Sequence, residues 1–113
     1  MPTSALDIAG WLAPFIDGPL RTHGGVLNVC NTGPAASWHT YGETTLRLAA
    51  ELGIRLRSTS ITPTRLADAA GFKAPRPVNT AMSPERLASL IGTRPRPWPE
   101  ALREYLHTYH AAA

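Results

Sequence analysis

The sequence predicts an α/β fold, in the form of a small, mostly helical lobe with two short strands. Apolar side chains recur at helical spacing in five segments, most of which begin at a Ser, Thr or Pro and end at a Gly. Two short runs bounded by turn residues have the apolar or alternating pattern of strands. A chain of 113 residues fits one domain, which we take as residues 1–113.

Five helices are expected from their start and stop signals. Ser37 and Ser83 are suitable N-caps, and Gly53 and Gly92 are suitable stops. The N-cap of the first helix is expected at Thr3 or Ser4. In chain order, the expected helices span about residues 5–16, 38–52, 63–70, 84–91 and 98–110.

The two expected strands are residues 26–31 and 54–61. The first is short and mostly apolar, and the second alternates apolar with polar residues. Two strands do not form a stable sheet alone, so helices or a partner should cover them. Cys30, the single cysteine, lies in the first strand and is expected to be a buried small hydrophobe rather than a nucleophile.

Composition narrows the possible function classes. Ten Arg and one Lys outnumber eight acidic residues and give a net charge of +3, but they are scattered, which argues against a nucleic-acid surface. No apolar stretch approaches the ~18 residues of a membrane span, and the N-terminus does not resemble a signal peptide. We therefore expect a cytoplasmic protein that binds neither nucleic acid nor membrane.

The most distinctive segment is residues 76–87, R-P-V-N-T-A-M-S-P-E-R-L. It resembles the closing segment of dTDP-4-dehydrorhamnose reductases, which reads roughly R-P-x-N-S-x-L-D before a helix. Residues 2–9, 25–33, 37–43 and 98–106 resemble further family segments in the same order, including the ending W-x-x-A-L-x-x-Y-L. The resemblance covers nearly the whole chain.

The resemblance implies what this chain has and what it lacks. Members of this family are extended short-chain dehydrogenases/reductases, whose N-terminal Rossmann domain binds NADPH through G-x-x-G-x-x-G and uses a Tyr-x-x-x-Lys pair. Neither motif occurs here, since the only lysine is Lys73 and position 69 is Ala. We therefore expect the C-terminal dTDP-sugar-binding portion without the Rossmann half, with no catalytic residue and no cofactor of its own.

Arg76 is the first candidate for a ligand contact. The resemblance places it at a nucleotide-sugar cleft, where a guanidinium can hold a diphosphate through two hydrogen bonds. The alternative is that Arg76 pairs within the chain and pins its segment. Asn79 is a weaker candidate, because Asn79 and Thr80 more often hydrogen-bond the neighbouring backbone.

A second group of candidates surrounds the loop before the second helix. Asn31, Thr32 and Ser37 lie where backbone N–H groups at a helix start favour an anion, although Ser37 is first a cap. Trp38 could stack on a sugar or base, but a Trp in the first turn of an amphipathic helix more often belongs to the core.

Three functions remain to be compared. We favour a dTDP-sugar-binding lobe that depends on a separate Rossmann chain for any hydride transfer. Its expected partners are that chain or further copies of itself in a homo-oligomer. An interaction module that has lost ligand binding is the second. A complete enzyme of another class is disfavoured because no catalytic constellation is evident. No metal site is expected, since His107 and His110 have no evident third ligand.

Overall fold

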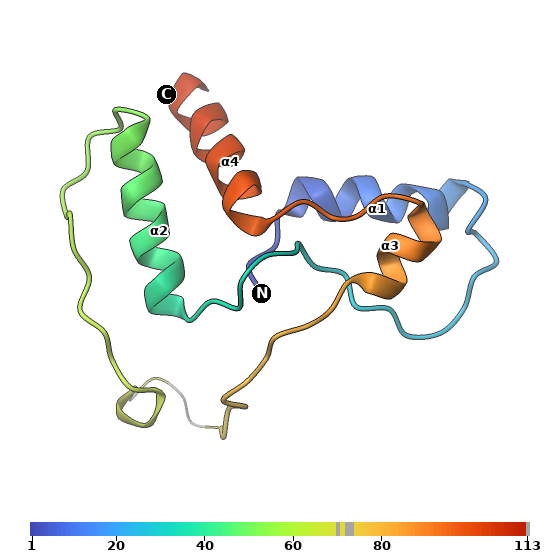
Figure 1. The fold of residues 1–113 in the computed structure, drawn as a ribbon, viewed down its shortest axis with the longest axis horizontal. Helices are drawn as coiled ribbons and strands as arrows, with labels where there is room; N and C mark the ends of the chain where they lie inside the picture. The colour runs from blue at the N-terminus through green and yellow to red at the C-terminus, as the bar shows by residue number, and fades with distance from the viewer. Residues whose placement is uncertain (70, 72–73, 113) are drawn as a thin grey trace.

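Helices and connecting segments make up residues 1–69, 71 and 74–112, which the computed structural model describes (Figure 1). The regular elements of this part are four α-helices and one short 3₁₀ helix. They are α1 (Ala5–Asp17), α2 (Trp38–Glu51), η1 (Leu66–Asp68), α3 (Glu85–Ile91) and α4 (Trp98–Ala112).

The predicted ends of the four α-helices are confirmed to within one or two residues. The Ser4 hydroxyl caps α1 by accepting from the Asp7 N–H at 3.3 Å, and the Ser37 hydroxyl caps α2 by accepting from Thr40 N–H at 3.0 Å. Gly92 ends α3 in the left-handed region, with φ of 71°, where other residues are strained. The expected cap at Ser83 is wrong, because the N-cap of α3 is Pro84, which has no side-chain hydrogen bond. The other ends depend on local chemistry, which explains why sequence predicts them.

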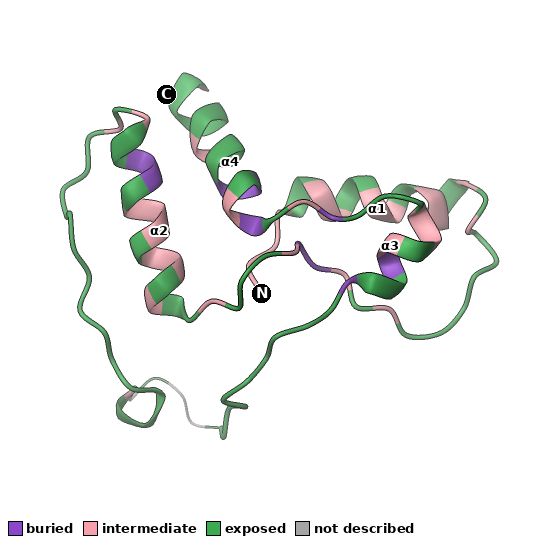
Figure 2. Cartoon of the chain, in the orientation of Figure 1, coloured by how far each residue is buried: buried purple, intermediate pink, exposed green. Residues whose placement is uncertain are grey.

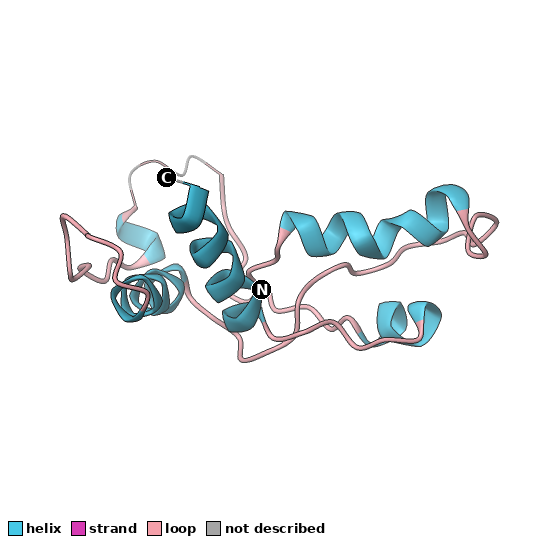
Figure 3. Ribbon diagram, turned by 90° about the horizontal axis from the view of Figure 1, so that it is seen from above, coloured by secondary structure: helices cyan, strands magenta, loops and turns pink. Residues whose placement is uncertain are grey.

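The α/β class is wrong, because neither expected strand forms in the described residues (Figure 3). The pairing recorded there is one isolated parallel bridge, between Thr32 and Pro97. The alternation in residues 54–61 has another cause. Leu56 and Ile61 line a hollow against Leu46 and Ala50 of α2, so the pattern serves a helix face instead of a sheet.

The run at residues 26–31 also packs without pairing as a strand. Cys30, near its end, is fully buried, and its thiol donates to the Met82 carbonyl at 3.7 Å. Arg86 of α3 donates to the Val26 carbonyl at 3.0 Å. The Cys30 side chain and the Val26 carbonyl thus contact the segment before α3 and α3 itself, while the Val26 side chain is 84% exposed.

The third expected helix, residues 63–70, is reduced to η1. Its last residue, Ala70, lies outside the described residues. A short helix is marginal unless tertiary packing supports it, and η1 has no buried residue. The cap-plus-proline signal at Thr62-Pro63 is therefore present without the packing that would extend a helix from it.

The main apolar core lies where α2 and α4 meet. Leu48 of α2 and Trp98 and Leu102 of α4 are buried there, and Figure 2 shows the buried positions on these facing helices. Glu51 of α2 joins the helices at the surface by ion pairs to Arg103 of α4 and Arg47. Hydrogen bonds from Arg103 and then Arg47 hold the pKa of Glu51 below its usual value.

The chain is spread out rather than rounded. Its radius of gyration is 16.7 Å, whereas about 13 Å is typical of 113 residues. Its accessible surface is 8415 Å², against about 6,000 Å² for a folded monomer of this mass. Residues 52–69 and 74–83 are mostly exposed, and Figure 1 shows them passing outside the helices.

The small core makes Leu48→Ala a direct test of the packing. It should lower the free energy of unfolding by about 2–5 kcal/mol, because it removes buried methyl groups and leaves a cavity. The measurement is urea unfolding followed by circular dichroism. Ile16→Ala on α1 is the matched control, since Ile16 is 73% exposed, and should have little effect. Equal losses in both variants would contradict this placement of the core.

Candidate functional site

A cleft of about 690 Å³, here named the α4 cleft, lies in the described part of the chain. It is bounded by α4, by the N-terminal segment with the start of α1, and by Tyr41 of α2. The side chains that matter for its chemistry are Tyr41, Arg96, Trp98, Glu104, Tyr105 and Tyr109. Its volume lies within the range of small-molecule sites.

Aromatic rings line much of the cleft. Trp98 is only 3% exposed, and its indole N–H donates to the Pro34 carbonyl at 2.9 Å. The Tyr41 ring packs against Trp98 with 5.8 Å between ring centroids. Tyr105 and Tyr109, one turn apart on α4, stack with centroids 6.2 Å apart and remain mostly exposed. The cleft thus has a fixed aromatic floor and an accessible aromatic wall.

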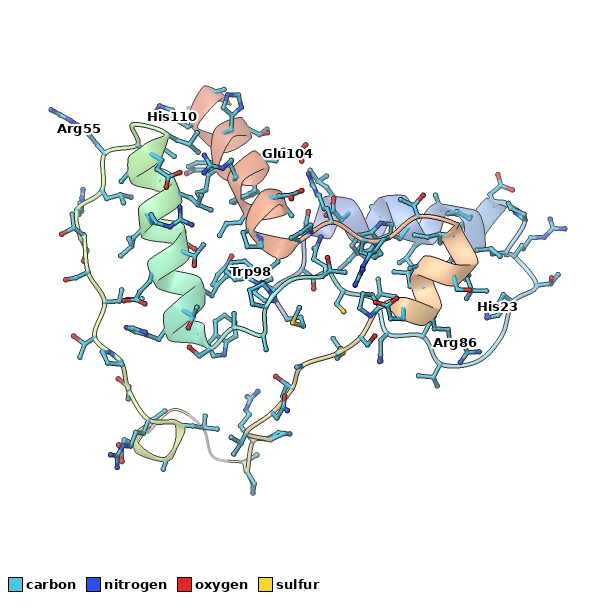
Figure 4. All side chains as sticks on the ribbon, viewed as in Figure 1. His23, Arg55, Arg86, Trp98, Glu104 and His110 are labelled. Atoms are coloured by element: carbon cyan, nitrogen blue, oxygen red, sulfur yellow. The ribbon has the colours of Figure 1, made fainter. Side chains whose placement is uncertain are left out.

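A charged cluster borders the same cleft. The Arg96 guanidinium donates from Nε to Asp7 Oδ2 at 2.9 Å and from Nη2 to Asp7 Oδ1 at 2.7 Å, and its Nη1 donates to Glu104. Figure 4 shows Glu104 projecting from α4 on the side toward α1. The Arg96 hydrogen bond is the main cause that lowers the pKa of Asp7, and burial acts against it.

Asn31 is hydrogen-bonded to this cluster and is fully buried. Its Oδ1 accepts from the Ser4 N–H at 2.8 Å, and its Nδ2 donates to Asp7 Oδ2 at 2.7 Å and to the Arg96 carbonyl at 3.1 Å. The amide therefore joins three segments of the chain. In this structure the Asn31 amide, which was predicted to contact a ligand, makes its hydrogen bonds within the chain.

Thr32 and Ser37 also make contacts within the chain. The Thr32 hydroxyl donates to the Pro95 carbonyl at 2.8 Å, and its backbone carbonyl accepts from Trp98 N–H at 2.8 Å. Ser37 is exposed and caps α2, as expected. Their proposed contact with a ligand stays a prediction.

Trp38 is 83% exposed, so the preferred assignment to the core is wrong. Its indole contacts the ring of Tyr41 edge-on, with 6.3 Å between the centroids. The buried stripe of α2 lies farther along, at Leu48 and Ala49, where α4 covers it. Since this indole does not serve the core, its stacking on a ligand stays a prediction.

Arg76 and Asn79 lie on residues 74–80, between η1 and α3, and both are exposed. The Asn79 side-chain oxygen accepts from the Ala81 N–H at 3.0 Å, which confirms the preferred backbone role. The six candidates thus occupy three places: the buried junction at Asn31, the start of α2, and this segment. None of the six lines the α4 cleft or the hollow beside α2.

Two expectations concerned reactive or metal-binding groups. Cys30 is confirmed as buried, and desolvation raises the pKa of its thiol, which disfavours the nucleophilic thiolate. Across residues 1–69, 71 and 74–112, no three His, Cys, Asp or Glu side chains are grouped as metal ligands would be. Lys73, which bore on the missing Tyr-x-x-x-Lys pair, lies outside the described residues.

The α4 cleft was missed from sequence. The four-residue spacing of Tyr105 and Tyr109 was a usable signal, but it is also the spacing of an ordinary apolar stripe. The pairing of Arg96 with Asp7, 89 residues apart, has no local signal. Sequence therefore indicated the helix but not the cleft.

None of the described helices is both long and apolar enough to cross a membrane.

Comparison with known proteins identifies relatives of the whole chain. The family model described as RmlD substrate binding domain matches residues 1–111. A spore coat polysaccharide biosynthesis protein, SpsK of Bacillus subtilis (strain 168), is 32% identical over 111 residues. The match covers 98% of this chain and 35% of SpsK, so the chain spans about a third of that relative. No solved structure matches at a significant level.

The Asp7–Arg96 pair should make stability depend on pH. Because the folded state lowers the pKa of Asp7, its stabilisation is complete above the unfolded value of about 4 and is lost as pH falls through the folded value. Asp7→Asn should therefore cost about 1–3 kcal/mol at neutral pH, and the difference from wild type should shrink in acid. Urea unfolding across pH measures both effects.

The matched control is Glu85→Gln, which alters an ion pair with Arg94 whose two side chains are 64% and 72% exposed. Such surface pairs contribute little, so this variant should follow the wild-type profile. A loss in Asp7→Asn that stays constant down to low pH would contradict an origin in the carboxylate charge.

Proposed function

The chain belongs to the RmlD substrate binding domain family, and we propose that it binds a nucleotide-linked sugar, specifically a dTDP-sugar. The observation that carries this proposal is the family match over residues 1–111. The relative SpsK is by name a polysaccharide biosynthesis protein, which is consistent with handling an activated sugar. Composition and the scattered basic residues agree with a small anionic ligand better than with nucleic acid.

Arg76 is the residue we propose for the diphosphate. Pro75 and Pro77 flank it and keep its backbone extended. The side chain is exposed on residues 74–80, and a planar guanidinium is well suited to two parallel hydrogen bonds with phosphate oxygens. Trp38, with its exposed indole, is the proposed stacking partner for the base or sugar.

We further propose that this chain does not reduce a sugar by itself. The cofactor loop and the Tyr-x-x-x-Lys pair that hydride transfer would need do not occur in its sequence. NADPH would then be bound by a Rossmann domain, which residues 1–113 do not contain. The spread-out shape and excess surface give support to such docking, and equally to the alternative of a pure interaction module.

The test is thermal unfolding of the chain with and without millimolar dTDP-rhamnose. A ligand that binds only the folded state raises the midpoint, so a cooperative transition that moves up supports the proposal. A cooperative transition that does not move would favour the interaction module. Arg76→Ala should weaken the binding by about 1.5–3 kcal/mol, the loss expected for a charged hydrogen bond, and calorimetry would measure it.

Arg55→Ala is the matched control for Arg76→Ala. Arg55 is also an exposed arginine on an irregular segment, and Figure 4 shows it pointing away from the molecule beyond the end of α2. Both variants lose one positive charge, so a general electrostatic effect would weaken binding equally. Equal affinity in the two variants would remove Arg76 from the site.

The proposed need for a partner has its own test. The chain is incubated with NADPH and a dTDP-4-keto-sugar, and the cofactor is followed by its absorbance at roughly 340 nm. This absorbance should fall no faster than it does in the protein-free blank. Cofactor oxidation above that blank, retained through purification, would overturn the proposal that this chain is not catalytic alone.

A further inference from the structure

We propose that the α4 cleft is a second binding site, for the ring of a neutral saccharide, separate from the residues assigned above to a nucleotide-sugar. None of those residues lines the cleft. The inference does not rest on dTDP-sugar binding, because it concerns another surface and another ligand charge. It rests on three features of the cleft: its aromatic wall, its hydrogen-bonding rim and the sign of its charge.

The aromatic wall fits the apolar face of a sugar ring. A pyranose presents C–H groups on one face, and these pack favourably on the electron-rich face of an aromatic ring. Tyr105 and Tyr109 offer stacked rings with an interplanar angle of 22°, 59% and 64% exposed. Trp98, which lines the same cleft, is held by its bond to Pro34, so this ring is already ordered before a ligand arrives.

The rim has hydrogen-bonding capacity left over. Arg96 uses one N–H from each of its three nitrogens toward Asp7 and Glu104, which leaves a second N–H on Nη1 and on Nη2. Glu104 is bonded to Arg96 through one carboxylate oxygen, and its other oxygen can accept. Thr108 adds a hydroxyl in the same cleft. Adjacent donors and acceptors of this kind match neighbouring sugar hydroxyls.

The charge of the rim selects against anions. Asp7 and Glu104 together contribute two negative charges, and Arg96 offsets only one of them. A phosphate brought into the cleft would meet a guanidinium already bound to two carboxylates, with a net negative charge around it. A neutral ring carries no such penalty. The cleft therefore differs in its ligand from the segment around Arg76.

The test is a titration of the isotope-labelled full chain, followed by amide chemical shifts. The probes are methyl α-rhamnopyranoside and methyl α-glucopyranoside, with glucose 1-phosphate as the anionic comparison. We expect saturable shifts at Glu104, Tyr105 and Thr108 with at least one neutral glycoside, and weaker binding of the phosphate. No saturable shift at these residues with either glycoside, or tighter binding of the phosphate there, would overturn the proposal.

Variants on α4 distinguish the loss of stacking on the sugar from a general effect of removing an aromatic ring from this helix. Tyr109→Ala should weaken the neutral glycoside about three- to ten-fold, the usual range for one aromatic contact. His107→Ala is the control, because it removes an exposed ring from the same helix outside the cleft. Glu104→Gln should narrow the preference for neutral over phosphorylated sugar. Equal effects of Tyr109→Ala and His107→Ala would place the binding elsewhere and contradict the assignment.

Discussion

The arrangement of this molecule depends on the hydrogen-bonded cluster of Asp7, Asn31 and Arg96. It joins the first turn of α1, the segment before α2 and the segment before α4, which are far apart in the chain. Helix α1 has no buried residue, so apolar packing alone does not hold it in place. Removing one partner of such a cluster leaves another charge or amide partly buried without its partner, which costs more than the intact cluster contributes.

The cluster also borders the α4 cleft. By fixing Arg96 just before α4, it sets the rim of the α4 cleft, and by using the Asn31 amide internally it takes that residue away from solvent. The segment around Arg76, residues 74–80, lies between η1 and α3 and does not line this cleft. The α4 cleft, with its aromatic rings and a rim of net negative charge, therefore differs from the exposed Arg76 guanidinium, which is suited to phosphate.

Sequence predicted those features that depend on neighbouring residues. Caps at Ser4 and Ser37 and the stop at Gly92 are local, and the structure has them. The strands failed because a strand requires a partner, and alternation at residues 54–61 arises equally from packing on a helix. The prediction that Trp38 belongs to the core was wrong, because burial on α2 depends on where α4 packs against it. The α4 cleft also depends on how distant segments pack, so the sequence indicated that its tyrosines belong to a helix but did not indicate a cleft.

The thin, spread-out form has a consequence for sequence variation in this family. Few of the described side chains are enclosed, among them Cys30, Leu48 and Leu87, so most positions contact solvent on at least one side. Substitutions at such positions change folding little. Many positions can therefore differ between relatives without loss of the fold. Relatives at about one-third identity, such as SpsK, are what this kind of architecture leads one to expect.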